Sequence, residues 1–175
     1  FGNGDDELLN RQGLTTVVNG NCGLSVAPAG EKFGKEIAGF LSSVTGDFRW
    51  RKDENTDDTE GALSSNKKEE SCGISANESV IDSLGIMSTM SAYLSALGKE
   101  TRSVNTGMLA GNGTIRAGVK GYAPGKLSKE ELHQVWKAVE EALSAGALGI
   151  SLGIAYAPEF EYDRDGLVEV LQPLK

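Results

Sequence analysis

The sequence contains a single histidine, His133, and only two cysteines, Cys22 and Cys72. Two cysteines so far apart do not form a disulfide framework, and a zinc site or a cysteine nucleophile usually needs histidine partners. Basic residues are also in the minority, since 17 Lys and Arg against 25 Asp and Glu give a formal net charge of −8. An acidic surface repels phosphate, so we exclude nucleic acid and anionic membranes as partners and expect small molecules or proteins.

Long hydrophobic runs are absent as well. The mean hydropathy of −0.26 excludes a membrane protein, and the N-terminus lacks the basic and apolar segments of a secretory signal. We therefore expect a cytoplasmic chain whose 175 residues fold as one unit. The 23 glycines far outnumber the 4 prolines and fall at the ends of apolar runs, where they separate structural elements rather than form a linker.

Three short apolar runs predict buried strands, at residues 14–18, 104–110 and 147–154. Apolar residues at helical spacing predict helices before or after these strands, over residues 31–44, 86–97, 129–144 and 166–171. Alternating strands and helices, with near-continuous apolar strands buried on both faces, predict an α/β fold with a parallel sheet or barrel.

The best-defined predicted helix follows Ser128, which forms a capping box with Glu131, while Gly146 supplies a left-handed stop. Ser88 and Gly98 are the corresponding start and left-handed stop of the preceding helix. The apolar stripe after Ser128 comprises Leu132, Val135, Trp136, Val139, Ala142 and Leu143.

Residues 46–77 have a different composition, with mixed charges, Ser, Thr and Asn and few apolar residues. This composition predicts a mobile surface insertion whose charges form a solvated face. We interpret Cys72, at the far edge of this segment, as a structural or incidental thiol.

In parallel α/β folds, ligands bind at the C-terminal ends of the strands, and three loops are predicted to converge there: residues 21–25, 111–116 and 156–159. Cys22 lies at the tip of the first loop. Thiolate is a good zinc ligand and a good nucleophile, but composition alone favours a buried structural cysteine over those roles. His133, early in the capped helix, fits surface scaffolding better than a ligand or a base.

Arg116 and Tyr156 are the candidate substrate contacts in the other two loops. The loop before Arg116 resembles a phosphate-binding loop only superficially, because Arg116 stands where the dinucleotide fingerprint needs its third glycine. Arg116 either clamps a carboxylate or forms a structural ion pair, and the Tyr156 hydroxyl either bonds a substrate oxygen or packs. Three acidic residues beyond Tyr156 fit a solvated loop and a helix cap better than an acid–base pair: Glu159, Glu161 and Asp163.

Three separated blocks, residues 12–23, 111–116 and 146–156, resemble the D-aminoacylase, or N-acyl-D-amino-acid deacylase, branch of the amidohydrolase superfamily. The blocks occur in the order of that family, and the resemblance covers most of the chain outside residues 46–77. It implies a distorted TIM barrel in which zinc activates water to hydrolyse the amide bond of an N-acyl-D-amino acid. By position, it implies that Cys22 is a metal ligand and that Tyr156 contacts the scissile carbonyl or the tetrahedral oxyanion.

The departures from the family limit what this chain does by itself. The His-x-His pair of the family is expected upstream of Gln12, its further histidines and aspartate are expected downstream of Lys175, and Asn112 replaces a usual histidine. Three βα units are also fewer than the eight of a closed barrel. We therefore predict an internal portion of a deacylase, an incomplete barrel that is inactive in isolation and whose open sheet edges favour self-association. The alternatives are a non-catalytic α/β interaction module, a degenerate relative without metal and, more weakly, a phosphate-binding domain.

Overall fold

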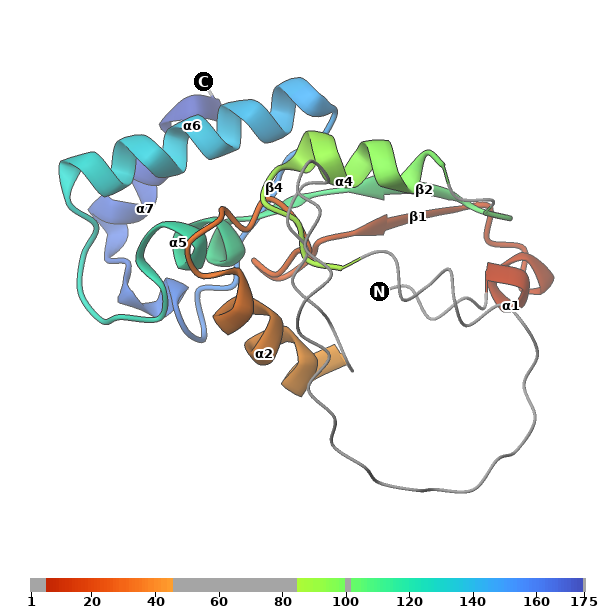
Figure 1. Cartoon of the computed structure of the whole chain (residues 1–175), viewed down its shortest axis with the longest axis horizontal. Helices are drawn as coiled ribbons and strands as arrows, with labels where there is room; N and C mark the ends of the chain where they lie inside the picture. The colour runs from red at the N-terminus through yellow and green to blue at the C-terminus, as the bar shows by residue number, and fades with distance from the viewer. Residues whose placement is uncertain (1–5, 46–84, 100–101, 175) are drawn as a thin grey trace, which may run out of the picture.

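A computed structural model describes residues 6–45, 85–99 and 102–174 (Figure 1). The predicted insertion over residues 46–77 and Cys72 lie outside the described residues. The described elements are, in chain order, α1 (Asp6–Arg11), β1 (Thr16–Asn19), α2 (Gly34–Thr45), α4 (Met90–Leu97), β2 (Asn105–Met108), β3 (Ala110–Gly111), α5 (Asn112–Lys120), α6 (Lys129–Ala145), β4 (Ile150–Ser151), the 3-10 helix η1 (Glu159–Glu161), α7 (Arg164–Val170) and the 3-10 helix η2 (Gln172–Leu174).

The three predicted strands lie side by side and run in the same direction. β1 pairs in parallel with β2, and β3 pairs in parallel with β4. Leu109 joins β2 to β3, and its N–H donates to the Asn19 carbonyl at 2.8 Å. On the other side, the Leu148 N–H donates to the Met108 carbonyl at 2.8 Å. The predicted α/β class and the parallel pairing are therefore confirmed, as small parallel sheets.

The strands are shorter and more exposed than predicted. Val18 is 43% exposed and Leu148 is 64% exposed, and a Cβ added at Gly107 would touch both of these side chains. Other large apolar residues around the strands are also exposed: Leu14, Leu152 and Ile154. The prediction of strands buried on both faces is wrong for the described chain, because the described helices leave this apolar side of the strands open.

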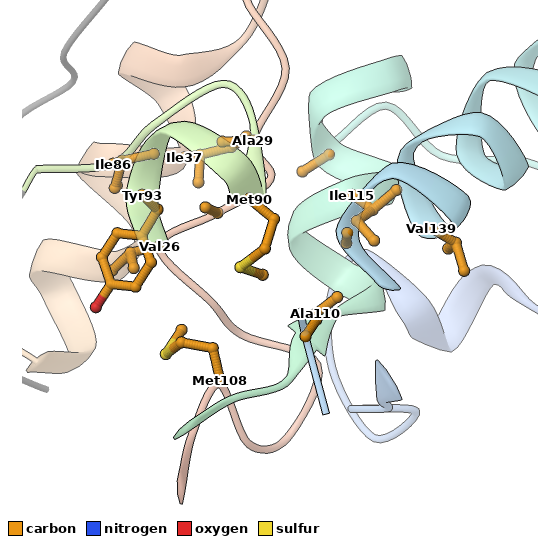
Figure 2. Packing of buried hydrophobic residues seen from close by; sticks show 14 of the residues in the cluster. Val26, Ala29, Ile37, Ile86, Met90, Tyr93, Met108, Ala110, Ile115 and Val139 are labelled. Carbon is orange, nitrogen blue, oxygen red and sulfur yellow. The ribbon is translucent and has the colours of Figure 1, made fainter. Parts of the chain in front are cut away.

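The hydrophobic core lies between the helices and the other side of the strands. Figure 2 shows Met90 of α4, Met108 of β2 and Ile115 of α5 gathered around one centre, with Val139 of α6 on the side of Ile115 that faces away from Met90. All four side chains are buried. α6 packs against both α4 and α5, so it joins the two halves of this core.

The capping signals of α6 are confirmed. The Ser128 hydroxyl accepts from the Glu131 N–H at 3.2 Å, and the Glu131 carboxylate accepts from the Ser128 N–H at 2.7 Å. Gly146 has a left-handed backbone with φ +113° and ends the helix as predicted. On the predicted apolar stripe, Val135 and Val139 are fully buried.

The predicted start of α4 is wrong, whereas its predicted end is right in position but not in backbone conformation. Thr89 caps the helix instead of Ser88, because its hydroxyl reaches the Ala92 N–H at 3.1 Å. Gly98 has φ −68°, so it continues the right-handed turn and donates to the Leu94 carbonyl at 2.9 Å.

Helix α5 begins where the sequence predicts a loop. The segment lacks an apolar stripe, and the glycines Gly113 and Gly118 have poor helix propensity. Close packing explains why it is nevertheless helical: a side chain at Gly118 would collide with the Ala29 carbonyl. Tertiary contacts that only glycine permits stabilise this helix, because a larger residue would push the two backbones apart.

Candidate functional site

The loop after β1, the first turn of α5 directly after β3 and the loop after β4 meet at one end of the strands, where the sequence predicts three loops. The Ser151 hydroxyl, at the end of β4, donates to the Gly20 carbonyl and accepts from the Gly23 N–H at 3.0 Å. The Thr114 N–H, in the first turn of α5, donates to the Gly23 carbonyl at 3.1 Å. The loop that follows β1 is therefore held between the end of β4 and the start of α5.

Cys22 stands at the tip of that loop with an exposed, free thiol. Its backbone has φ +57°, a left-handed conformation that is uncommon outside glycine. The Asn21 amide donates to the Val18 carbonyl at 3.0 Å and closes the turn that presents Cys22. The interpretation of Cys22 as a buried structural cysteine is therefore wrong, because the turn carries the side chain outwards.

Tyr156 lies beside Cys22. Its hydroxyl donates to the Cys22 carbonyl, which joins the loop after β4 to the loop after β1. Burial raises the pKa of the Tyr156 phenol, and the negative charges that Cys22 and Glu159 can carry raise it further. The phenol therefore stays neutral and keeps its proton for a hydrogen bond. Two of the three predicted site residues thus come together.

Glu159 is a residue that the sequence analysis misjudged. It is 1% exposed rather than part of a solvated loop. Its carboxylate accepts from the Asn112 side-chain amide at 2.6 Å and from the Gly153 N–H. Burial raises the pKa of Glu159, while these two hydrogen bonds and the charge of Arg116 act in the opposite direction. Nothing in the local sequence signals this burial, because half-buried Glu161 lies only two positions further along the same acidic segment.

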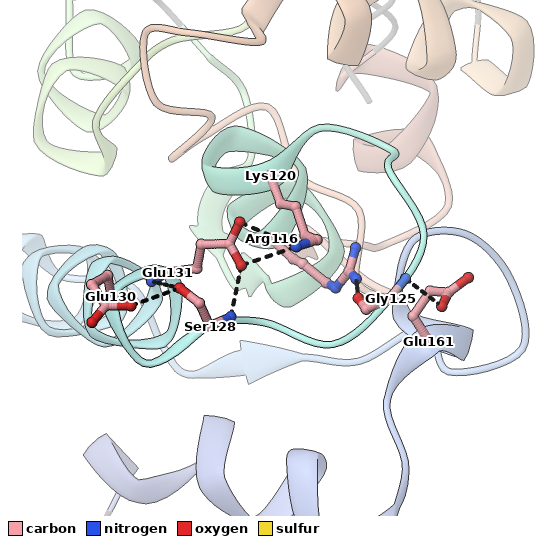
Figure 3. Close-up of polar contacts among 7 residues, drawn as sticks. All are labelled: Arg116, Lys120, Gly125, Ser128, Glu130, Glu131 and Glu161. Atoms are coloured by element: carbon pink, nitrogen blue, oxygen red, sulfur yellow. Dashed lines mark hydrogen bonds and ion pairs between the residues drawn. The ribbon is translucent and has the colours of Figure 1, made fainter.

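Arg116 is 0% exposed, so the protein encloses its side chain. Its Nη2 donates to the Gly125 carbonyl at 2.7 Å, and its guanidinium lies 5.4 Å from the centroid of the Tyr162 ring. Figure 3 shows the Gly125 backbone bonded to two side chains: its carbonyl accepts from Arg116, and its N–H donates to Glu161. Nearby, the Lys120 ammonium forms an ion pair with the Glu131 carboxylate at 3.0 Å. Arg116 therefore ties α5 to the loop that leads into α6.

The described residues do not complete a metal site. Within the described ranges, no group of three or more His, Cys, Asp or Glu side chains is close enough to hold a metal ion. A zinc site needs three or four such ligands, and Cys22 supplies one thiolate. His133 is exposed on α6, which agrees with its interpretation as surface scaffolding. No helix in the described part of the chain is long and apolar enough to cross a membrane.

Several known proteins are similar to this chain in sequence. No protein-family model matches the sequence. The chain is 27% identical over 163 residues to the D-aminoacylase of Alcaligenes xylosoxydans xylosoxydans, and 27% identical over 164 residues to an N-acyl-D-aspartate deacylase of the same organism. These matches cover 93% and 94% of this chain. The chain is homologous to the N-acyl-D-amino-acid deacylases.

Solved deacylase structures match in fold as well. A D-aminoacylase crystal structure described as defining a novel subset of amidohydrolases matches with a TM-score of 0.60 and 26% identity over 97% of this chain. An N-acyl-D-glutamate deacylase from Bordetella bronchiseptica, solved with zinc and a phosphonate mimic of the tetrahedral intermediate, matches with a TM-score of 0.67 and 22% identity. Another matching structure concerns the binuclear metal centre of D-aminoacylase. The resemblance inferred from the three sequence blocks is confirmed.

The chain corresponds to only part of these deacylases. It spans 26% and 25% of the two curated relatives, and 30% and 28% of the two solved chains described above. The activity, metal content and substrates of the deacylases therefore belong to longer proteins than the chain described here.

Proposed function

We propose that these residues form part of a zinc-dependent amidohydrolase that hydrolyses the amide bond of N-acyl-D-amino acids. The observation that carries this proposal is the meeting of Cys22 and Tyr156 at the strand ends. Homology to D-aminoacylase over 93% of the chain supports it. In the complete enzyme, Cys22 is one metal ligand, and the ligands missing from the described residues come from elsewhere in the longer protein.

Each residue of the site has a definite task in this proposal. Bound zinc lowers the pKa of a water molecule to about 7, which supplies hydroxide near neutral pH. The exposed Cys22 thiolate offers a soft ligand at the tip of a tight turn. The neutral Tyr156 phenol, now bonded to the Cys22 carbonyl, donates instead to the scissile carbonyl or to the oxyanion. A substrate contact by Arg116 stays a prediction, and its burial favours the structural alternative.

The test of this function uses the complete protein that contains these residues. Zinc content and hydrolysis of N-acetyl-D-amino acids are measured for the wild type, for Cys22→Ala and for Cys72→Ala as the matched control. We expect Cys22→Ala to lose most of its zinc and activity and Cys72→Ala to keep both. Wild-type zinc and activity in Cys22→Ala would overturn the proposal.

The isolated 175-residue chain gives a complementary result. With added zinc, we expect it to hydrolyse no N-acyl-D-amino acid above background, because its described residues offer a single ligand at the site. Turnover well above background by this chain would show that our account of the missing ligands is wrong.

A degenerate relative or a non-catalytic module is the second candidate. It is favoured by Asn112, which stands where the family usually has a histidine and which bonds Glu159. Absence of zinc from the complete wild-type protein would favour this candidate. The phosphate-binding alternative finds no support, because the Glu159 carboxylate already lies against the first turn of α5.

A further inference from the structure

Glu159 lies where the loop after β1, the first turn of α5 and the loop after β4 meet. A side chain at Gly23, in the loop after β1, would collide with a Glu159 carboxylate oxygen. A Cβ at Gly113, in the first turn of α5, would lie 3.2 Å from the same oxygen. The Gly153 N–H, in the loop after β4, donates to this oxygen as well. One buried carboxylate therefore contacts all three strand ends.

Each oxygen of the Glu159 carboxylate accepts a hydrogen bond from a different donor. Oε1 accepts from the Asn112 side-chain amide at 2.6 Å, and Oε2 accepts from the Gly153 N–H. Asn112 and Glu159 are both buried, so little water competes for these bonds. An ionised carboxylate is a pure acceptor and satisfies both donors at once, which a neutral amide at the same position does not.

Short stretches of chain and hydrogen bonds connect Glu159 to Cys22 and Tyr156. Glu159 follows Tyr156 by three positions, and the Tyr156 hydroxyl bonds the Cys22 carbonyl. Gly23, which packs against the carboxylate, is the next residue after Cys22 and is itself bonded to Ser151 and Thr114. A shift of Glu159 therefore moves both sides of the contact between Cys22 and Tyr156.

We propose that Glu159 is a positioning residue whose buried carboxylate holds the loops of Cys22 and Tyr156 in their mutual arrangement. The part that this arrangement plays in catalysis rests on the proposed function, whereas the arrangement itself does not. A carboxylate that only added to overall stability would protect every part of the fold equally. A positioning carboxylate acts first on the three loops that it contacts.

The experiment compares loop opening with opening of the core in the 175-residue chain. Amide hydrogen exchange is measured by NMR at Gly23 and Gly153, with Val139 in α6 as the remote reference. Glu159→Gln keeps the shape but removes the negative charge and one of the two acceptor oxygens. We expect the exchange of the two glycines, relative to that of Val139, to rise about 10-fold. Glu161→Gln is the matched control, because Glu161 also accepts a backbone N–H, at 2.8 Å from Gly125.

A polarity swap sharpens the test. In the double variant Asn112→Asp with Glu159→Gln, the Gln amide donates to the new Asp while the Gln oxygen accepts from Gly153. The buried carboxylate is kept, and both hydrogen bonds are restored with one reversed. We expect the exchange ratio to return to within about threefold of wild type. If Glu159→Gln alone does not fold, Glu159 supports the whole fold rather than the loops that it contacts, and the positioning role is overturned.

Labelling of the Cys22 thiol in a Cys72→Ser background provides a second measurement. We expect Glu159→Gln to change the labelling rate severalfold, and Glu161→Gln to leave it unchanged. Equal acceleration of exchange at Gly23, Gly153 and Val139, or an unchanged ratio in Glu159→Gln, would overturn the positioning role. These measurements need neither metal nor substrate, so they stand apart from the zinc analysis of Cys22→Ala that tests the proposed function.

Discussion

Gly23 shows how much a single residue of this site depends on its surroundings. Its backbone has φ +71°, and any side chain there would meet the Glu159 carboxylate. Gly13 has a similar φ of +80°, but a Cβ at that position has no atom within 4 Å. Replacing Gly13 by alanine therefore costs only the strain of a left-handed backbone. Replacing Gly23 by alanine adds the cost of the collision with the Glu159 carboxylate.

We expect Gly23→Ala to lower the free energy of unfolding by about 3 kcal/mol, from left-handed strain plus overpacking. Gly13→Ala is the matched control and should lose only about 1 kcal/mol, from strain alone. Urea denaturation of the 175-residue chain, followed by circular dichroism, measures both values. Equal losses in the two variants would show that the Glu159 carboxylate leaves room at Gly23.

Arg116 provides a second prediction at the residue scale. Its side chain is fully buried, bonds the Gly125 carbonyl and supplies positive charge near Glu159. Replacing it by Met leaves a buried carboxylate without that charge, so we expect a loss of about 3 kcal/mol of unfolding free energy. Arg164→Met, at an exposed position in α7, should change the same quantity by less than about 0.5 kcal/mol. Similar small losses in both variants would contradict a structural role for Arg116.

At the scale of elements, α6 and α5 show opposite relations between sequence and structure. α6 carries its own start, stop and apolar stripe within one continuous stretch, so its pattern predicts it correctly. α5 has glycines and a buried arginine in place of a stripe, and only its neighbours explain why it is helical. Local signals suffice for a helix on the surface of the core, whereas a helix buried on most sides needs contacts from distant residues.

The capping box of α6 gives a prediction at this scale. Ser128→Ala removes the hydroxyl that accepts the Glu131 N–H, and we expect it to cost about 1 kcal/mol of unfolding free energy. Ser144→Ala, at an exposed position near the other end of α6, is the control and should have almost no effect. Thermal or urea unfolding measures the difference. A neutral Ser128→Ala would mean that solvent replaces the cap at no cost.

Glu131 adds a pH dependence to the same helix end. Its hydrogen bond to the Ser128 N–H lowers its pKa most; burial opposes this shift, and Lys120 lowers the pKa further. The folded pKa lies below the ordinary value of 4.5, so the stabilisation is complete above that value and is lost as the pH falls through the folded pKa. We expect Glu131→Gln to flatten this part of the profile of unfolding free energy against pH. If the unfolding free energy of Glu131→Gln fell at low pH just as that of the wild type does, Glu131 would not be the source of this pH dependence.

At the scale of the whole molecule, the described residues leave one apolar side of the strands exposed. Val18 and Leu148 lie together on it, and both are exposed. Parallel sheets are ordinarily covered on both faces, and unpaired strand edges invite association. Self-association of the isolated chain through these strands stays a prediction.

Sedimentation of the 175-residue chain tests this prediction. We expect the average mass to rise with protein concentration in the wild type, and Leu148→Lys to keep the chain monomeric over the same range, because a lysine opposes burial of this surface. Leu174→Lys, at an exposed position on η2, is the control and should behave as the wild type does. A wild-type chain that is monomeric at every concentration would contradict the prediction.

Local sequence alone determined the capped helix α6, the order of the three predicted strands, and the positions of Cys22 and Tyr156 in the loops that follow strands. Each of these is encoded in a short continuous stretch whose spacing or turn residues act on their own neighbours. Tertiary structure decided the helical start of α5, the exposure of Val18 and Leu148, and the burial of Glu159. Glu159 is buried because it meets Asn112, 47 positions away, and the glycines of two other loops. The environment of a charge depends on which distant residues fold around it, and a local pattern carries no record of them.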